Sequence, residues 1–509
     1  MKTQATLAIT LLLTATGLRA QGGSLTPPPG PPAPVMRTLD ELYTQGENID
    51  TRAESIGILT VNQGLQITEI EENLHRVKKS TPIRSLAGDP TALYLITAPG
   101  HYHLDADITG ESGKAGIRIN AQNVTIDLNS HTLSGVTGST KGIEVNLTGP
   151  VTIRGGTLRN WPQQAVHIIN ADYLLQDLQI VGTLDKGVES NGVGVIERVT
   201  VKSAKNAGLY CNNASPTLIR DCRVEGITST TGSAIGIFAP KALITRCTVS
   251  NITGSSASSA ESDAVCGISA SDGKVQGCVV RGIVQNGGGY CFGVYKAAQT
   301  LETTVHQVSS ANAYTRVVGI LGGQVSSCSV TTLNANFQAA GIDQALAVQG
   351  CTVRDILSPT GSSGIGAETV THCTVINTSS AVQGVSVSNN TLKDVQTGIY
   401  LSGGVARDNV IYASYQGINV SSGATVIGNT LIGTSAAGSI GIEHTISTNP
   451  VTRIEDNLVR GWGIGIRAQI GLVRRNGVGE CTTAYTISAN MTVVPITALG
   501  TNPNANISY

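Results

Sequence analysis

One short pattern, a glycine followed by isoleucine, valine or leucine, recurs along this chain from residue 116 to residue 465. If Ala165-Val166 is counted as a degenerate copy, the pattern takes 15 steps of about 23 residues each. The longest step lies between Gly236 and Gly267 and contains an insertion, GSSASSAESD, at residues 254–263. The glycines of the other copies are Gly116, Gly142, Gly187, Gly208, Gly293, Gly319, Gly341, Gly364, Gly384, Gly398, Gly417, Gly441 and Gly465.

A second pattern, apolar-x-x-(Cys or Asn)-x-apolar, follows each glycine after about ten residues. Its residue type changes from Cys to Asn toward the C-terminus, and a few repeats carry a different residue. The repeated position holds Gly156, Leu178, Val199, Cys222, Cys247, Cys278, Thr304, Cys328, Cys351, Cys373, Asn390, Asn409, Asn429, Asn457 and Asn476.

Repeats of this length predict a solenoid, because one coil of about 23 residues cannot bury its own apolar face but stacked coils can. Each coil rises by one strand spacing, about 4.8 Å, so equivalent residues lie directly above one another. Inward Ile, Val and Leu side chains then form a continuous core, and stacked Asn amides can hydrogen-bond along the axis. We therefore predict an all-β, single-stranded parallel β-helix of about 16 rungs, roughly 75 Å long.

Two segments carry a family resemblance: LYLITAPGHYHLDADITGESGKAGIRINAQNVTIDLNSHTLSGV at residues 93–136 and VTIRGGTLRNW at 151–161. They resemble the opening of bacterial right-handed parallel β-helix repeat proteins of the pectin-lyase-like fold. The resemblance extends over residues 82–509, and the later repeats are also similar to copper-chaperone-type periplasmic repeats and carbohydrate-active β-helices. It implies a right-handed β-helix, but it implies no particular activity, because no shared activity defines these proteins.

The N-terminal part of the chain has a different composition. Residues 1–20 have the basic start, short apolar stretch and small residues of a signal peptide, so we expect an exported protein: secreted, periplasmic or on the cell surface. Residues 21–35 form a Pro-rich linker, and residues 36–81 are expected to be helical. Apolar heptads across residues 39–77 favour a coiled-coil stalk and a homo-oligomer, or else helices folded back on the end of the β-helix.

Charge excludes some partners and favours others. The 33 basic and 34 acidic residues nearly cancel and form no basic block, so nucleic acid is not an expected partner. No segment reaches the length of a membrane-spanning helix. The weakly charged, hydroxyl-rich composition suits a polysaccharide or surface glycan.

The chain has ten cysteines. Six of them share the inward repeated position, where we expect packed free thiols, because parallel side chains on adjacent rungs fit disulfide geometry poorly. Cys266 and Cys291 lie about one rung apart and are the pair most compatible with a disulfide.

A candidate metal site lies in the expected strand that runs from residue 100 to residue 108. Alternation places His101, His103, Asp105 and Asp107 on one face, where two imidazoles and two carboxylates suit a metal or proton sharing. The alternative is a solvated outer face at the beginning of the β-helix.

A candidate catalytic column is formed by the residues just before the repeated position, namely Asp177, Arg198, Asp221 and Arg246. Carboxylates that hold Ca²⁺, together with an arginine base, are what a polysaccharide lyase needs, whereas a glycoside hydrolase needs two carboxyls. The alternative is a ladder of surface ion pairs. The catalytic motifs of polygalacturonases and pectate lyases are missing from the chain.

These observations favour an exported structural or binding module that contacts glycans and requires no cofactor. The alternative is a lyase or hydrolase acting on an acidic polysaccharide, with Ca²⁺ as the cofactor of a lyase. A phage-type tailspike would fit the stalk but conflicts with the signal peptide. A groove beside Asp177 to Arg246, walled by the insertion at residues 254–263, is the observation that would best separate these functions.

Overall fold

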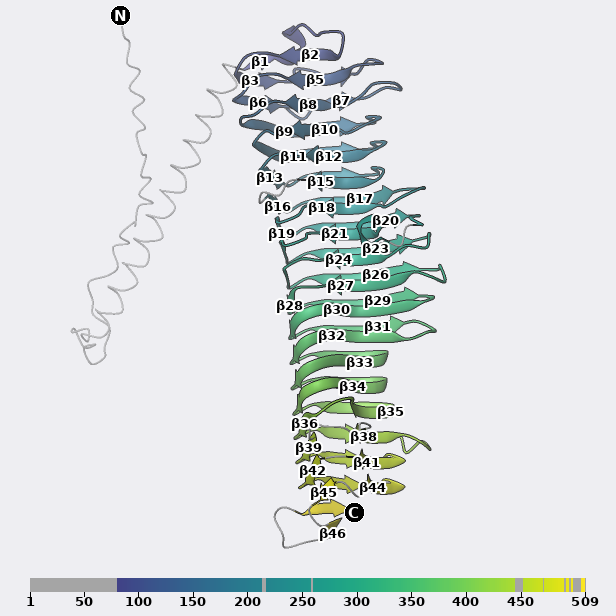
Figure 1. The fold of residues 1–509 in the computed structure, drawn as a ribbon. Coiled ribbons are helices and arrows are strands. Elements are labelled where there is room, and N and C mark those ends of the chain that lie inside the picture. The colour runs from purple at the N-terminus through teal and green to yellow at the C-terminus, as the bar shows by residue number, and fades with distance from the viewer. Residues whose placement is uncertain are drawn as a thin grey trace, which may run out of the picture. The chain divides into compact units, whose positions relative to one another are not determined.

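The part of the chain that follows residue 80 folds into one long stack of parallel β-strands (Figure 1). The computed structural model describes residues 80–508 except 213–216, 258–259, 445–451, 470, 489–490, 494–495 and 498–504. Its coils make about 17 turns, close to the 16 rungs expected, and the predicted all-β architecture is confirmed. The expected signal peptide, linker and nearly all of the 36–81 helical segment lie outside the described residues, and Thr81 begins the first strand.

Each coil contributes strands to three parallel sheets, which we number by their order in the coil that begins at residue 92. The first sheet contains β2 Ala92–Ile96, β5 Ala115–Ile119, β8 Ile143–Asn146, β10 Val166–Ile169, β12 Lys186–Ser190, β15 Ala207–Cys211, β18 Ile235–Phe238, β21 Val265–Ser269, β24 Cys291–Tyr295, β27 Arg316–Leu321, β38 Ile440–His444, β41 Ile464–Ala468 and β44 Thr483–Ile487. The second contains β1 Thr81–Pro82, β3 Gly100–His103, β6 Val124–Asp127, β13 Gly194–Glu197, β16 Leu218–Arg220, β19 Leu243–Thr245, β22 Lys274–Gln276, β25 Gln299–Leu301, β28 Gln324–Ser326, β36 Ala424–Ile427, β39 Thr452–Glu455, β42 Gly471–Arg474 and β45 Met491–Val493. The third contains β4 Ile108–Thr109, β7 Thr132–Ser134, β14 Thr200–Lys202, β17 Arg223–Thr228, β20 Thr248–Gly254, β23 Val279–Gln285, β26 Thr304–Ser310, β29 Ser329–Ala335, β31 Thr352–Leu357, β37 Thr430–Ile432, β40 Leu458–Arg460, β43 Gly477–Gly479, β46 Ile496–Thr497 and β47 Asn506–Ser508.

Some strands run around a corner from one sheet into the next. They are β9 Val151–Arg159, β11 Tyr173–Val181, β30 Gln338–Gln349, β32 Ser362–Thr371, β33 Thr374–Ser388, β34 Thr391–Arg407 and β35 Val410–Val420. Two short 3-10 turns, η1 Ile83–Ser85 and η2 Glu261–Asp263, are the helical elements within the described residues. No helix in this part of the chain is long and apolar enough to cross a membrane.

The recurring glycine and the recurring valine are two sides of one contact. A Cβ atom at Gly267 would lie 2.3 Å from Cγ1 of Val280, the apolar residue that ends the second pattern in the same coil, and 2.7 Å from the carbonyl oxygen of Gly293 in the next coil. Gly236 has the same relation to Val249. Glycine recurs there because the neighbouring valine and the backbone above leave no room for a side chain.

Gly267→Ala should therefore lower the free energy of unfolding by about 2–3 kcal/mol through overpacking. Adding Val280→Ala should recover part of that loss, so that a double-mutant cycle in urea gives a favourable coupling of about 1 kcal/mol. Gly288→Ala is the control, because no atom lies within 4 Å of the place that its methyl group would take. A Gly267→Ala protein as stable as the parent would contradict this explanation of the repeat.

The register corrects the sequence prediction at two repeats. Cys278 donates its backbone N–H to Oγ1 of Thr303, so Thr303, rather than Thr304, continues the second pattern. In the first sheet Ile365 pairs with Val382, which makes Ala381-Val382 the repeat unit in place of Gly384-Val385. Val385 is in fact 45% exposed, because that coil has only 17 residues between equivalent positions and the spacing of about 23 no longer applies.

The repeated Cys and Asn positions form a buried polar ladder. Oδ1 of Asn429 accepts both the backbone N–H and the Nδ2–H of Asn409, at 3.0 and 2.9 Å, and the same pattern repeats from Asn390 to Asn506. In the Cys part, Sγ of Cys278 accepts the backbone N–H of Cys247 at 3.4 Å. Cys and Asn thus bind the same backbone groups, and we call this set of positions the ladder.

All ten cysteines are free thiols. The expected Cys266–Cys291 disulfide is wrong, because the register pairs Val265 with Cys291 and Cys266 with Phe292. Adjacent residues of a strand point to opposite faces, so the two thiols lie on opposite sides of the sheet.

Candidate functional site

The column that contains Asp177, Arg198, Asp221 and Arg246 lies at a sharp bend between the second and third sheets. All four residues have φ between +52° and +56°, so their side chains project outward while the following ladder residue points inward. Nε and Nη2 of Arg198 bind the two carboxylate oxygens of Asp177 at 2.7 and 3.1 Å. Arg246 holds both oxygens of Asp221 in the same way, at 2.7 Å each.

These carboxylates are engaged by arginines on neighbouring coils, and the side chains are exposed to solvent. The bond from Arg246 lowers the pKa of Asp221, so both partners carry charge and bind one another. The insertion at residues 254–263 does not wall this column in its described part, because its Glu261 lines a hollow on the first sheet together with Phe238 and Tyr295. The geometry is that of a surface ion-pair ladder, in which each pair contributes at most about 1 kcal/mol.

The four candidate metal ligands near the N-terminal end do not share one strand, because β3 ends at His103. His103 lies 2.9 Å from the hydroxyl of Ser80, and Asp105 lies 3.6 Å from Arg84. Asp107 accepts the backbone N–H of Thr132 at 2.8 Å, a bond that lowers its pKa.

His101 lies exposed on β3. Within the described ranges no group of three or more His, Cys, Asp or Glu side chains is placed to hold a metal ion. The predicted convergence of His101, His103, Asp105 and Asp107 is therefore wrong, since the chain turns after His103 and gives the acidic residues separate partners.

A pronounced hollow lies elsewhere, on the third sheet, where it crosses five successive coils between residues 356 and 434. It has a volume of about 550 Å³. It forms where the coils become short. Ladder residues are separated by 17, 19 and 20 positions from Cys373 to Asn429, against 23 between Cys328 and Cys351 and 28 between Asn429 and Asn457. The shorter coils lack the loops that protrude from their neighbours, and we call the resulting depression the groove.

The polar groups that line the groove are mainly neutral, and they alternate with apolar residues such as Leu357. Asn377, Gln396 and Ser414 supply amide and hydroxyl groups, and Tyr412 supplies a ring that is 40% exposed. Asp394 is the single carboxylate among its described lining residues, which include no Lys or Arg. Both Asn377 and Asp394 have positive φ, which turns the chain sharply and presents their side chains outward.

None of the groove residues was among the candidates drawn from the sequence. A signal was present in the spacing of the ladder, which contracts from Cys373 to Asn429. The contraction could have located the groove, although not its lining, because the outward residues there share no repeated pattern.

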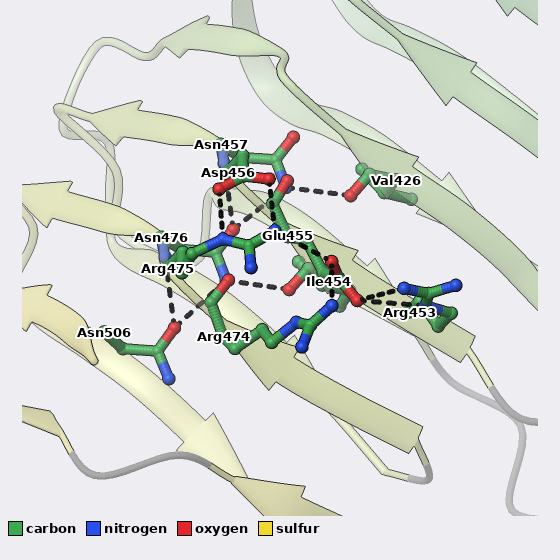
Figure 2. A network of polar contacts seen from close by, with 10 residues as sticks. All are labelled: Val426, Arg453, Ile454, Glu455, Asp456, Asn457, Arg474, Arg475, Asn476 and Asn506. Carbon is green, nitrogen blue, oxygen red and sulfur yellow. Dashed lines mark hydrogen bonds and ion pairs between the residues drawn. The ribbon is translucent and has the colours of Figure 1, made fainter. Parts of the chain in front are cut away.

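A second polar cluster is buried at the corner of β39 and β42 (Figure 2). Glu455 is 1% exposed, and its carboxylate binds Arg453 at 2.9 Å, Arg474 at 3.0 Å and Arg475 at 3.2 Å. Burial raises the pKa of Glu455, but the bonds from Arg474 and Arg453 outweigh burial and hold it below its ordinary value. The carboxylate and the arginines of this cluster bind one another, so we infer that the cluster stabilises the fold rather than binding a ligand.

Stacked parallel coils with an internal ladder define the protein as a β-helix. Residues 141–300 match a protein-family model described as "Right handed beta helix region", so the predicted right-handed parallel β-helix is confirmed. The fold supports a place for the chain among pectin-lyase-like proteins. A search of curated proteins gives no significant match to this chain.

Proposed function

We propose that this protein is an exported glycan-binding module whose groove holds a segment of neutral polysaccharide along the axis of the β-helix. The observation that carries the proposal is the groove itself, with its amide, hydroxyl and tyrosine lining. Such groups bind sugar hydroxyls by hydrogen bonds and the apolar face of a sugar ring by stacking. The signal-peptide pattern of residues 1–20 supports a place of action outside the cytoplasm.

The length of the groove favours a chain over a single sugar. Five coils are separated by four strand spacings, so the groove extends roughly 19 Å along the axis. Its direction follows the stacking axis, because each coil contributes similar outward positions one above another. A linear polysaccharide would therefore contact several coils at once.

The charge of the groove favours a neutral glycan and binding without cleavage. An acidic glycan would be repelled by Asp394 and would find no cation among the described lining residues. Hydrolysis by the usual route requires two carboxyls facing the scissile bond, and β-elimination from a uronate requires a base together with charge neutralisation. The lining supplies one carboxylate and neither of the other groups.

The test is affinity electrophoresis and calorimetry of the full chain with neutral polysaccharides, such as β-glucan, xylan and mannan, and with polygalacturonate and alginate. We expect binding to at least one neutral polymer, and we expect Tyr412→Ala to weaken it at least tenfold through loss of a stacking contact. Tyr314→Ala is the matched control, because Tyr314 is 81% exposed and lies outside the groove.

Three results would contradict the proposal: no binding to any polymer, binding unaffected by Tyr412→Ala, or retention of acidic polymers alone. Release of reducing ends or of an unsaturated product would instead show a hydrolase or lyase. In that case Asp394→Asn, and separately Asp221→Ala and Arg198→Ala, would identify which surface carries the reaction.

A further inference from the structure

The outer surface of the first sheet carries a second, smaller hollow beneath the insertion at residues 254–263. It has a volume of about 230 Å³. Its apolar walls are Ile235, Phe238, Ala264, Cys266 and Tyr295, and its polar groups are Glu261, Ser269 and Ser271. We call it the cavity. It lies on a different sheet from the groove, so a ligand could occupy it whether or not the groove binds a glycan.

The cavity lies in a gap in a stack of aromatic rings. The rings of Tyr210 and Phe238, on adjacent coils, lie parallel with centroids 4.6 Å apart. The register places Ser269 directly after Phe238 along the axis, and Tyr295 directly after Ser269. Phe238 and Tyr295 are thus two strand spacings apart, about 9.6 Å, with only a small side chain between them.

From this geometry we propose that the cavity binds a single flat aromatic ring that carries a hydroxyl group, a phenol, seated over Ser269 against the ring of Phe238. Tyr210 covers one side of Phe238, and the phenol takes the corresponding place on the side that borders the cavity. An apolar cavity of about 150 Å³ holds benzene, so 230 Å³ accommodates a ring with one or two substituents.

The hydroxyl of the phenol has an acceptor in the cavity. Oε2 of Glu261 accepts Nζ–H of Lys296 at 2.8 Å and the hydroxyl of Tyr295 at 3.1 Å. Its other oxygen, Oε1, has no partner among the described residues. The bond from Lys296 lowers the pKa of Glu261, so the carboxylate is ionised and accepts a hydrogen bond.

The lining favours a phenol over a sugar ring. A pyranose carries hydroxyls around its whole rim, and those facing Ile235, Ala264 and Cys266 would lose their hydrogen bonds to water without replacement. Burial raises the pKa of the Cys266 thiol well above its ordinary value, so the thiol is neutral and acts as an apolar wall. A ring with one polar substituent leaves none of its own polar atoms without a partner.

The experiment measures binding of 4-methylphenol, toluene and methyl glucoside to the full chain by ligand-observed NMR. We expect 4-methylphenol to bind and methyl glucoside not to bind. Ser269→Phe should fill the gap with the protein's own ring, weaken 4-methylphenol at least tenfold and raise the thermal midpoint. Gln276→Phe, an outward position of the same coil flanked by Thr245 and Leu301, is the control and should leave binding unchanged.

Glu261→Gln should weaken 4-methylphenol severalfold and leave toluene unchanged, which separates the hydroxyl contact from packing. A crystal soaked in 4-bromophenol should show anomalous scattering between Phe238 and Tyr295, and this measurement needs no variant. Absence of that peak, tighter binding of methyl glucoside than of 4-methylphenol, or equal binding to the Ser269→Phe protein would each overturn the proposal.

Discussion

Asn429→Ala is expected to lower the free energy of unfolding by about 3–6 kcal/mol, whereas Asn429→Cys should cost less than half as much. Removing the amide leaves the backbone N–H of Asn409 without its acceptor and takes one hydrogen bond from each of the carbonyls of Ala406 and Ile427, of which Ile427 keeps the bond from the N–H of Asp408. These groups are buried, so water cannot replace the lost bonds, and each costs about 1–3 kcal/mol.

Cysteine should replace Asn429 at a smaller cost, because cysteine takes the same ladder position in other coils. Sγ of Cys278 accepts a backbone N–H from the preceding coil, and its thiol faces the carbonyls of Ile244 and Gln276. Urea unfolding, with hydrogen exchange at the amide of Asn409, measures both the global and the local effect. Asn419→Ala is the control, because that partly exposed side chain gives one hydrogen bond, to Oε1 of Gln416, and should matter by no more than about 1 kcal/mol.

If Asn429→Cys destabilised the protein as much as Asn429→Ala, the equivalence of Cys and Asn in the ladder would be refuted. A small effect of both variants would mean instead that the ladder is not a principal source of stability. If Cys and Asn are equivalent in the ladder, Asn429→Ala should be strongly destabilising and Asn429→Cys only mildly so.

Glu455→Gln is expected to cost about 2–4 kcal/mol at neutral pH, because it leaves three guanidinium groups without their shared counter-charge (Figure 2). The value lies near the lower end for a buried pair, since the arginines themselves are 30–50% exposed. Thermal or urea unfolding at neutral pH measures this loss.

Because of the Glu455 carboxylate, we expect the free energy of unfolding to depend on pH. The pKa of Glu455 is lower in the folded protein than its ordinary value of 4.5, so the unfolded chain binds the proton more readily. Its stabilisation is therefore fully present above about pH 4.5 and is lost as the pH falls through the folded value. The difference in stability between the parent protein and Glu455→Gln should narrow between pH 6 and pH 3.

Asp456→Asn is the matched control, because Asp456 binds Arg475 with both oxygens but is 40% exposed. It should cost no more than about 1 kcal/mol. If the difference in free energy of unfolding between the parent protein and Glu455→Gln stayed constant with pH, the charge of Glu455 would not be what stabilises the fold.

Much of the architecture could be predicted because a solenoid translates sequence spacing into distance along its axis. Gly267 and Val280 recur together since each coil must place a small residue opposite a branched one, and that requirement repeats with the coil. The prediction failed where the coil length changed. At Gly384 the period is shorter, and at Thr304 the prediction is one residue out of register because no Cys or Asn marks the ladder position there.

The candidate sites could not be predicted in the same way. His101 and Asp107 were placed on one face by alternation, but the strand ends between them, and strand ends depend on the hydrogen bonds of the next coil. The groove and the cavity arise from residues that are missing: loops absent near Asp394 and a ring absent at Ser269. A missing group leaves no motif for a single sequence to show.

The inward half of this protein, namely the parallel coils, their aliphatic core and the ladder, could be inferred from the repeats, because every coil meets the same neighbours and so repeats the same residues. The outward half depends on how the folded coils stack. Outward side chains such as Phe238 and Tyr295 are far apart in sequence and come into line through the exact number of residues in each intervening coil. Changes in loop length alter that number freely, since loops at the surface cost little to lengthen or shorten. The groove lies where the coils are shortened, and the cavity lies beside an insertion.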